Sequence, residues 1–582
     1  MLADRRFTAV VLVFGVLLMV TSIGGGFQLD DHYQRFRLLG LGDPAIDLFI
    51  FFDGDEARNA QAMEVGAVPW WTTPDLRHAN FRYLSVLSMQ LDYWLWPDQP
   101  ERMHLHSLAW LAALIAAAAL LFRQIFGATW AAGLALLMYG IDEAHALPVA
   151  YLANRGAVIA TCFGILCIWS FARWRDDQWR PGSILTPLFL ALALSAGEIA
   201  LATAGYLFSY SVFIDRDTIT RRIRAWIPCG IVLLLWAAIY KLGGYGAAGS
   251  GFYLDPLGDT IAFLEALTHR VPVLLLGQWT PIPADFVLAS SLDAAGRSAM
   301  VVAGVVTATC IALVLIPVLR TNRSARFWAL GSLLALLPIA GTGPQNRLLF
   351  FVGLGSFALI AQLLEALLGD SEASPINRWW RGSAWVTASL LLLFHLALAP
   401  FLIAPTVAFH DRSAAALRVL FDSVPDEDSL SEQTLIIVNP PDYTYGVGAI
   451  QPTQISANRG TPARVRSLSA GGTPAHVTRI DDHTLRVDLE AGLFPNTFSR
   501  YYRSKKVGFS PGWSIALSDV EIEIEQVDQA GDPKQLLFRF RQRLEDHSLS
   551  WLVWENGEYR GWTPPAIGES QMIPAAASIF SQ

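Results

Sequence analysis

A series of eleven apolar runs, each close to the length that crosses a lipid bilayer, constrains this chain more than any other feature. A transmembrane helix needs about 20 consecutive, mostly apolar residues. Hydrophobic residues make up 53% of the sequence and charged residues only 16%, so we expect a mainly α-helical polytopic membrane protein. The runs cover residues 7–26, 104–122, 128–141, 152–172, 183–196, 199–214, 225–240, 298–319, 327–340, 348–368 and 384–404.

Basic residues are distributed unevenly among the loops between these runs. Loops on one side contain most of the arginines, such as Arg123, Arg221 and Arg320, whereas the short loops on the other side contain few. Cytoplasmic loops of membrane proteins carry an excess of Lys and Arg. We therefore predict a multi-pass protein of the cell inner (cytoplasmic) membrane with a cytoplasmic N-terminus. The first run is long and lacks a good cleavage site, which favours an uncleaved helix over a signal peptide.

The composition changes after residue 404, where the chain becomes polar and rich in turn residues. Residues 484–489 and 520–525 alternate between apolar and polar side chains, as half-buried strands do. Further strands are predicted at residues 435–438, 536–541 and 549–554, and a hairpin turn at Asn556-Gly557. We therefore divide the chain into a transmembrane domain and a soluble β-rich domain that is periplasmic or extracellular. Their expected bounds are residues 1–404, with outer loops at about 27–101 and 243–297, and residues 405–582.

Polar residues gather at the predicted outer ends of the apolar runs. Asp30 and Asp31 directly follow the first run, where a carboxylate is costly unless it faces water, a metal or a substrate. Two acids near a set of arginines would suit a general base beside a phosphate-binding pocket. The alternative is that each acid pairs with a neighbour at a helix end. Placement does not separate these readings for Asp30, Asp31 or Glu198, whereas structural pairing is favoured for Asp142 and Glu143.

Several other chemistries lack their sequence signatures. The chain has no P-loop, no Gly-rich dinucleotide turn after a strand, no HExxH motif and no paired CxxC motif. Its four cysteines all lie in apolar runs, which is typical of small core residues rather than of disulfides or a metal site. A net charge of −8 without a long basic run argues against nucleic-acid binding.

Several segments resemble the GT-C fold glycosyltransferases, and most strongly the transmembrane O-mannosyltransferase family with tetratricopeptide repeats and its bacterial relatives. Residues 78–96 and 100–108, which include His78, Arg82 and His104, resemble the loop and second helix of these enzymes. The other matches are Asp30-Asp31 with a paired-acid motif, Asp142 to Arg155 with a His-containing loop and Gly-Arg pair, Ser195-Ala-Gly-Glu198 with a Ser-Lys-Glu motif, and Asn346-Arg347-Leu-Leu-Phe-Phe with an Arg-Tyr-Leu-Tyr-Leu-Pro segment. Their order agrees over roughly residues 7–368.

The sequence also departs from that family. Tyr83 follows Arg82 where the family has proline, and Ala157 stands near the place of an acid after the Gly-Arg pair. Gly197 replaces the lysine before the glutamate, and a β-rich region stands where the tetratricopeptide repeats would be.

The resemblance implies a GT-C-like bundle of about 11 transmembrane helices and a glycosyltransferase activity. The donor would be a sugar on a polyprenyl phosphate in the bilayer, and the acceptor a protein or glycan outside the membrane. Asp30, with Asp31, would be the base that activates an acceptor hydroxyl, with inversion at the anomeric carbon. The residues implied to bind substrate are His78, Arg82, His145, Arg155, Glu198 and Arg347. No cofactor is required and no metal ligand is assigned, although paired acids also suit Mg²⁺ or Mn²⁺.

Two other classes of function stay open at the level of sequence. A non-enzymatic membrane protein would bind a lipid-linked glycan or present the β-rich domain as a scaffold. A transporter would be expected to show pseudo-symmetry between its halves, which this sequence lacks. An enzyme should bring Asp30 and Arg347 to one outward cavity, and a scaffold need not.

Overall fold

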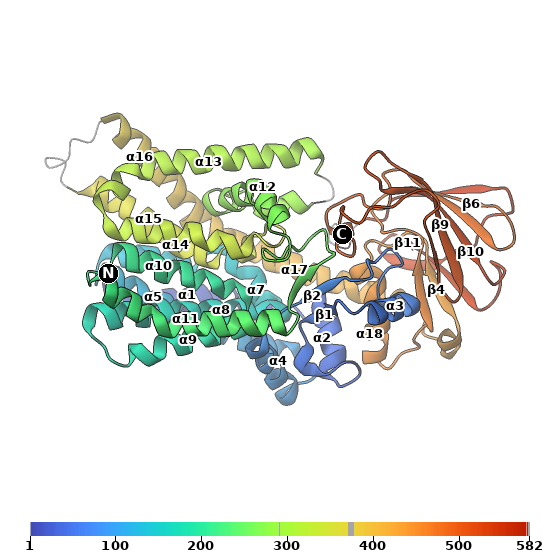
Figure 1. Ribbon diagram of the computed structural model, residues 1–582, viewed down its shortest axis with the longest axis horizontal. Coiled ribbons are helices and arrows are strands. Elements are labelled where there is room, and N and C mark those ends of the chain that lie inside the picture. Colours follow the sequence, from blue (N-terminus) through green and yellow to red (C-terminus); the bar gives the residue numbers. More distant parts are fainter. Residues whose placement is uncertain (1, 290–291, 370–377, 578, 580–582) are drawn as a thin grey trace. The chain divides into compact units, whose positions relative to one another are not determined.

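The computed structural model describes residues 2–289, 292–369, 378–577 and 579, and the chain forms two compact units. Unit 1 consists of Met1–Gly26, Asn80–Tyr245 and Asp259–His410, and unit 2 of Phe27–Ala79, Gly246–Gly258 and Asp411–Gln582. Figure 1 shows the helices of unit 1 and the sheets of unit 2. This grouping differs from the division expected at residue 404, because two polar loops assigned to the transmembrane domain belong to the same unit as the C-terminal region.

Unit 1 is built mainly from α-helices. They are α1 (Arg5–Leu18), α4 (Tyr83–Leu95), α5 (Pro100–Phe126), α6 (Trp130–Gly140), α7 (Ala146–Ala150), α8 (Arg155–Asp177), α9 (Gly182–Ala196), α10 (Ala202–Phe213), α11 (Ile219–Leu242), α12 (Thr260–Trp279), α13 (Ala294–Thr321), α14 (Arg323–Ile339), α15 (Phe350–Leu368), α16 (Arg378–Leu392) and α17 (Ala399–Ser423). A π-helical segment, Leu393–Leu398, joins α16 to α17. Side chains of Thr129, Asp259, Asp293 and Asn322 accept first-turn amides and so define where four of these helices begin.

Eight helical stretches among the described residues are long and apolar enough to cross a membrane. They are Arg6–Gly24, Pro100–Phe126, Leu152–Asp177, Ile219–Leu242, Thr260–Trp279, Ala294–Thr321, Phe350–Leu368 and Arg378–Ser423. The fifth of these, α12, falls in a region that the sequence assigned to an outer loop. The predicted runs 128–141, 183–196, 199–214 and 327–340 form the shorter helices α6, α9, α10 and α14. The prediction of a mainly helical membrane protein is confirmed, and eight of the helical stretches among the described residues are full-length candidate spans.

Helices α5, α8 and α15 form the centre of unit 1. In their most apolar windows 56%, 78% and 83% of the residues are buried, against 11% in α11 and 17% in α13. Helices α11 and α13 instead expose large apolar side chains, such as Leu234 and Val302. Extended apolar surface of this kind is typical of a face that contacts lipid.

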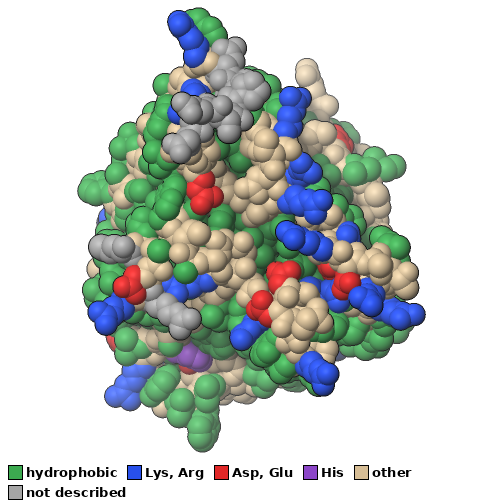
Figure 2. All heavy atoms as spheres, turned by 90° about the vertical axis from the view of Figure 1, so that its left-hand side faces the viewer, with side chains coloured by type: hydrophobic (Ala, Val, Ile, Leu, Met, Phe, Trp, Pro, Cys, Tyr) green, Lys and Arg blue, Asp and Glu red, His purple; other side chains and the backbone are tan. Residues whose placement is uncertain are grey.

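Basic side chains are prominent on the side of the molecule that carries the N-terminus in Figure 1. Figure 2 shows this side, where blue Lys and Arg side chains are more widespread than red Asp and Glu side chains. Among the loop and helix-end residues, Arg180, Arg216, Arg221 and Arg224 are exposed. These are arginines of the loops that the sequence predicts to be cytoplasmic.

Unit 2 contains three β-sheets in its described residues, together with helices α2 (Asp30–Leu38), α3 (Glu56–Val65) and α18 (Ile450–Ser456). The sheets have the strand orders β1-β2-β3, β13-β6-β7-β10-β9-β8 and β12-β11-β4-β5. Neighbouring strands are antiparallel, except that β4 is parallel to both β11 and β5. The strands are β1 (Ile50–Asp53), β2 (Arg77–Ala79), β3 (Gly246–Ala248), β4 (Thr434–Ile437), β5 (Arg464–Ser467), β6 (Ala475–Arg479), β7 (Thr484–Leu489), β8 (Ser514–Ala516), β9 (Val520–Val527), β10 (Pro533–Phe540), β11 (Leu549–Glu555), β12 (Glu558–Gly561) and β13 (Ser570–Ile573).

The alternating patterns in the C-terminal sequence do form half-buried strands. In β9 the side chains of Ile522 and Ile524 are buried, whereas Glu521 is exposed. The predicted hairpin turn joins β11 to β12, and both Asn556 and Gly557 have positive φ angles, of 52° and 87°. Positive φ at both central residues is what a type I′ hairpin turn requires. The prediction of a β-rich C-terminal region is confirmed.

The segment Phe27–Ala79 completes the core of unit 2. Trp70 and Trp71 are buried, and the indole N–H of Trp70 donates a hydrogen bond to the Ser467 carbonyl at 3.2 Å. The buried guanidinium of Arg466 donates to the Glu64 carbonyl at 2.9 Å. Unit 2 is therefore a single core built from distant parts of the sequence rather than a C-terminal domain alone.

Candidate functional site

The two acids that follow the first membrane helix lie in unit 2 and have different surroundings. Asp31 is 2% exposed, and its Oδ2 accepts the backbone N–H of Gln28 at 2.9 Å. Asp30 is half-buried, and its Oδ1 accepts a hydrogen bond from the Tyr445 hydroxyl at 3.1 Å. Asp31 therefore stabilises the turn before α2, whereas Asp30 is oriented by a phenol from another part of unit 2.

Aromatic rings hold His78 within unit 2. The His78 ring stacks on Tyr253, with centroids 4.1 Å apart, and on Phe51 at 5.1 Å. Its Nδ1 lies 2.6 Å from the hydroxyl oxygen of Tyr501, and the side chain is 7% exposed. His78 is thus held by stacking and by its hydrogen bond with Tyr501.

Arg82 and Glu198 form an ion pair in unit 1. The Arg82 Nε donates to Glu198 Oε2 at 2.8 Å, and the backbone N–H of Phe81 donates to Glu198 Oε1 at 3.0 Å. Both oxygens of Glu198 therefore bind the chain just before α4. The structure brings these two predicted site residues together as a helix-end pair.

Arg155 is buried in the centre of unit 1 and bound on all sides. Its guanidinium forms an ion pair with Asp92 and donates to Ser107 Oγ at 2.8 Å and to the Met103 carbonyl at 2.7 Å. The other oxygen of Asp92 lies 2.6 Å from His106 Nδ1. Arg155 is 1% exposed, so its described role is to join α4, α5 and α8.

His145 lies in the core of unit 1. Its ring stacks on Phe350, with centroids 4.9 Å apart, and meets Tyr139 edge-on at 4.8 Å. Burial lowers the pKa of His145 to about 3, so the ring is neutral. These contacts make His145 an aromatic packing residue.

Asn346 is the centre of a hydrogen-bond network in unit 1. Its side-chain amide donates to Glu143 Oε1 at 2.6 Å, and its Oδ1 accepts the backbone N–H of Ala284 at 2.9 Å. Its own backbone N–H donates to Asp285 Oδ2 at 2.8 Å. Through its side chain and its backbone N–H, Asn346 therefore connects the loop after α6 and the loop after α12 to the segment just before α15.

Arg347 adjoins this network and is half-buried. Its Nε donates to Gln345 Oε1 at 2.8 Å. Burial raises the pKa of Asp285, and the nearby charge of Arg347 opposes that rise. Arg82 and Arg155 each form an ion pair with a carboxylate. Among the described residues of unit 1, Arg347 forms no such ion pair.

A small pocket with a volume of about 20 Å³ lies beside the network in unit 1. Asp142, Glu143 and Gln278 line one side of it, and Phe394 and His395 line another. Burial raises the pKa of both acids, and the charge of Asp142 raises the pKa of Glu143 further. The pocket thus combines acids that resist ionisation with an apolar wall.

Sequence reasoning assigned Asp142 and Glu143 to structural pairing and did not single out Asp285, Gln278 or His395. The bond between Glu143 and Asn346 agrees with a pairing role, but the pocket adds a second feature. The available signal was the adjacent pair of acids at the end of an unusually short apolar run. Gln278 and His395 carry no comparable local signal, since each is one polar residue within an apolar stretch.

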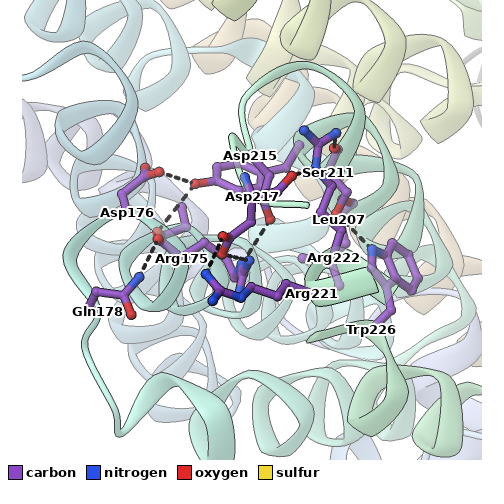
Figure 3. A network of polar contacts seen from close by, with 12 residues as sticks. Arg175, Asp176, Gln178, Leu207, Ser211, Asp215, Asp217, Arg221, Arg222 and Trp226 are labelled. Carbon is purple, nitrogen blue, oxygen red and sulfur yellow. Dashed lines mark hydrogen bonds and ion pairs between the residues drawn. The ribbon is translucent and has the colours of Figure 1, made fainter. Parts of the chain in front are cut away.

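A second polar cluster lies in unit 1 at the ends of α8, α10 and α11, and Figure 3 shows it. Arg175 forms ion pairs with Asp215 at 2.9 Å and with Asp217 at 2.6 Å. Arg221 and Arg222 also bind Asp217, through its side chain at 3.2 Å and its carbonyl at 2.8 Å. Asp215 and Asp217 are both paired with arginines, and Arg222 binds backbone carbonyls, so we assign the cluster a structural role.

The described residues include no group of three or more His, Cys, Asp or Glu side chains placed to hold a metal ion.

No family model and no curated protein matches this chain. Among solved structures, similarity is found to an oligosaccharyltransferase and to ArnT. One is the Archaeoglobus fulgidus oligosaccharyltransferase, with a tethered acceptor peptide (12% identity, TM-score 0.41, 80% of this chain and 64% of that chain) and in the apo form (11%, 0.40, 81% and 66%). Another is apo ArnT from Cupriavidus metallidurans (12%, 0.35, 78% and 88%). The chain thus spans just under two thirds of the archaeal enzyme, and likeness at this level carries no information on the reaction.

Proposed function

We propose that this chain is an integral-membrane glycosyltransferase that moves a sugar from a polyprenyl-phosphate donor to an acceptor outside the membrane. The acceptor is a protein or a glycan, and the sugar is transferred with inversion. The proposal rests on the motif resemblance between residues 7 and 368 and on the polytopic helical fold. The observation that carries it is the setting of Asp30.

Asp30 has the position and the surroundings of a general base. It begins α2 a few residues after the first membrane helix, and the Tyr445 hydroxyl orients one of its oxygens. A general base must be held within hydrogen-bonding reach of the proton that it removes. In this proposal Asp30 takes the proton of an acceptor hydroxyl, and Asp31 holds the turn that positions Asp30.

Phosphate binding falls to Arg347 in this proposal. Arg155 is enclosed by Asp92 and its neighbours, and Arg82 binds Glu198. A guanidinium suits a phosphate because its planar donors match the phosphate oxygens. The other predicted substrate-binding residues then have structural roles within their own units. They are Arg82, Glu198, His78, His145 and Arg155.

The deciding experiment compares lipid-linked sugars and cell-envelope glycans by mass spectrometry in cells with and without this protein. An active enzyme consumes one lipid-linked sugar and produces one glycosylated acceptor. Asp30→Asn keeps the shape and should reduce transfer by about 10²–10⁴-fold, the usual contribution of a general base. Asp43→Asn is a matched control, because Asp43 is an exposed acid of unit 2 that pairs with Arg37.

The alternative is a non-enzymatic protein that binds a lipid-linked glycan or presents unit 2 as a scaffold. Transfer that persists in the Asp30→Asn, Asp31→Asn double variant removes the catalytic role argued here. Unchanged glycans in cells without the protein would favour the non-enzymatic alternative.

A further inference from the structure

The first turns of α11 have an inner face that is bound to the rest of unit 1. The guanidinium of Arg222 donates to the carbonyls of Asp217 and Ser211, both at 2.8 Å. The indole N–H of Trp226 donates to Ser211 Oγ at 2.8 Å. Figure 3 shows these contacts, which join α11 to the end of α10 and to the loop that follows it. Arg222 and Trp226 are one helical turn apart, so together they determine which side of α11 faces outward.

Two arginines lie on the outer face of the same turns. The Arg221 side chain is 70% exposed, and Arg224, three positions later, is also exposed. Residues three positions apart are neighbours on a helix surface, so the two guanidinium groups can reach one ligand. Arg216, in the loop just before α11, is exposed as well.

The acids of the adjoining loops do not cancel this positive charge. Residues 173–180 and 215–224 contain seven arginines and four aspartates, which leaves three positive charges. Asp215 and Asp217 both pair with Arg175, whose side chain is only 10% exposed. The two acids closest to α11 in the sequence are therefore bound to a mostly buried arginine, and the excess positive charge lies on the exposed arginines.

Large apolar side chains continue the outer face of α11 beyond the arginines. Ile227, Ile231 and Leu235 are 53%, 52% and 58% exposed. They follow Arg224 by three, seven and eleven positions, which is the spacing of residues on one face of a helix. Only 11% of the most apolar window of α11 is buried. Basic groups followed by an apolar row match the phosphate and the acyl chain of a phospholipid in their order.

Helix α9 packs against α11 and repeats this arrangement. Arg180, two positions before α9, is exposed. Ile184 and Leu188, one helical turn apart on α9, are 72% and 46% exposed. The ion pair between Arg175 and Asp217 brings the end of α8 beside the loop that precedes α11. Two neighbouring helices therefore present arginines at one end of unit 1 and apolar side chains along their exposed length.

We infer that the outer face of α11 binds an anionic glycerophospholipid, with the phosphate at Arg221 and Arg224 and an acyl chain along Ile227 and Ile231. Guanidinium groups suit phosphate oxygens, and the excess of positive charge selects a lipid with a net negative charge. The sequence predicts that these loops are cytoplasmic, and the cytoplasmic leaflet carries the negative surface potential of a membrane. This lipid site does not depend on the proposed sugar transfer.

The test measures lipid binding to the purified full-length chain in detergent by native mass spectrometry. The probes are palmitoyl-oleoyl phosphatidylglycerol and palmitoyl-oleoyl phosphatidylcholine, which have the same acyl chains and differ in net charge. Each arginine near an anionic lipid should strengthen its binding by roughly fivefold, so the first phosphatidylglycerol should bind at least about fivefold more tightly than phosphatidylcholine. The double variant Arg221→Gln, Arg224→Gln should bring this preference to within about twofold.

The double variant Arg58→Gln, Arg560→Gln is the matched control, because it removes two arginines of unit 2 whose side chains are 75% and 51% exposed. It should keep the preference, and thermal unfolding checks that both double variants are folded. Equal binding of the two lipids by the natural chain, or a preference that survives in the α11 variant, overturns the inference. Loss of the preference in the control as well would overturn it too, because the net charge of the protein would then be responsible.

Glycerol 3-phosphate separates a lipid site from a site for phosphate alone. It has the phosphate but no acyl chain to lie along the apolar row, so it should not displace phosphatidylglycerol at equal concentration. Displacement at equal concentration would contradict the inference, because the arginines would then bind phosphate without using the apolar face of α11.

Discussion

Arg155 and Asp92 form an ion pair that is withdrawn from water, since their side chains are 1% and 2% exposed. Each of the two buried charges is compensated by the other. Breaking a buried pair by removing one partner typically costs about 3–5 kcal/mol, because the remaining charge is left unpaired. This pair is therefore a strong local determinant of how α4 and α8 pack.

Asp92→Ala should lower the thermal stability of the purified protein by an amount equivalent to about 3–5 kcal/mol. Glu198→Ala is the comparison, because Arg82 and Glu198 are 32% and 19% exposed and water partly replaces the lost partner. Its expected cost is nearer to 1 kcal/mol. Thermal unfolding in detergent measures both, and an equal shift in the two variants would contradict a structural role for Arg155.

The acids near Asn346 predict a pH dependence of stability. Burial raises the pKa of Asp142 and Glu143 in the folded chain, so the folded state keeps protons that the unfolded state releases. Stability from these groups is therefore highest below their ordinary pKa values and falls as pH rises towards the raised ones. Glu143→Gln should flatten the decline in thermal stability between about pH 5 and pH 9. A steeper decline in this variant would show that another group is responsible.

At the scale of elements, the segment Phe27–Ala79 determines whether the C-terminal strands of unit 2 have a complete core. Trp70 and Trp71 pack among aromatic residues of the C-terminal segment, such as Phe538 and Tyr443. Backbone contacts are equally close, since a Cβ on Gly66 would lie 1.9 Å from the Val465 carbonyl oxygen. Residues 411–582 expressed alone would lack these partners.

A fusion of residues 27–79 to residues 411–582 through a flexible linker should unfold cooperatively and at a higher temperature than residues 411–582 alone. Each large apolar side chain returned to the core contributes about 2 kcal/mol. Circular dichroism during heating measures the difference. Equal melting of the two proteins would show that the N-terminal segment is dispensable for the core.

At the scale of the whole molecule, unit 2 restricts the path of the chain through the membrane. Strand β3 pairs with β2, and the backbone N–H of Gly251 donates to the Arg500 carbonyl at 2.9 Å. The three segments of unit 2 therefore share one side of the bilayer, because open sheet edges and loops are not stable within it. The segment Asp259–His410 must then cross an even number of times.

We expect α12 to be the stretch that does not cross. Asp259–His410 contains α12, α13, α14, α15 and the stretch from α16 to α17, which are five helical stretches. Helix α12 has the lowest mean hydropathy of the eight candidates, 1.3, and contains Pro272 and the buried Arg270. We therefore expect α12 to enter and leave on one side, which restores eleven crossings.

Cysteine labelling tests this topology with a membrane-impermeant maleimide. Leu257→Cys and Phe286→Cys, at exposed positions on either side of α12, should both be labelled from outside the cell. Arg180→Cys, in a predicted cytoplasmic loop, should react only after permeabilisation. Labelling of Leu257→Cys and Phe286→Cys from opposite sides would show that α12 crosses.

The amino-acid sequence by itself determined the elements whose signal is local. Apolar run length marked most of the long helices, period-two alternation marked β7 and β9, and the Asn556-Gly557 dipeptide marked a hairpin turn. These patterns reflect the environment of each segment, lipid or a half-buried sheet, which neighbouring residues report together. The Arg distribution likewise indicated one orientation.

Only the tertiary structure decided which polar groups meet. Glu143 and Asn346 are 203 positions apart, and Asp92 and Arg155 are 63 apart, so no local spacing relates them. The same holds for the grouping of Phe27–Ala79 with the C-terminal strands and for the pocket between Asp142, Gln278 and His395. A buried polar group must find a partner wherever packing brings one within hydrogen-bonding distance. Its role therefore depends on contacts between distant segments, which local sequence patterns do not contain.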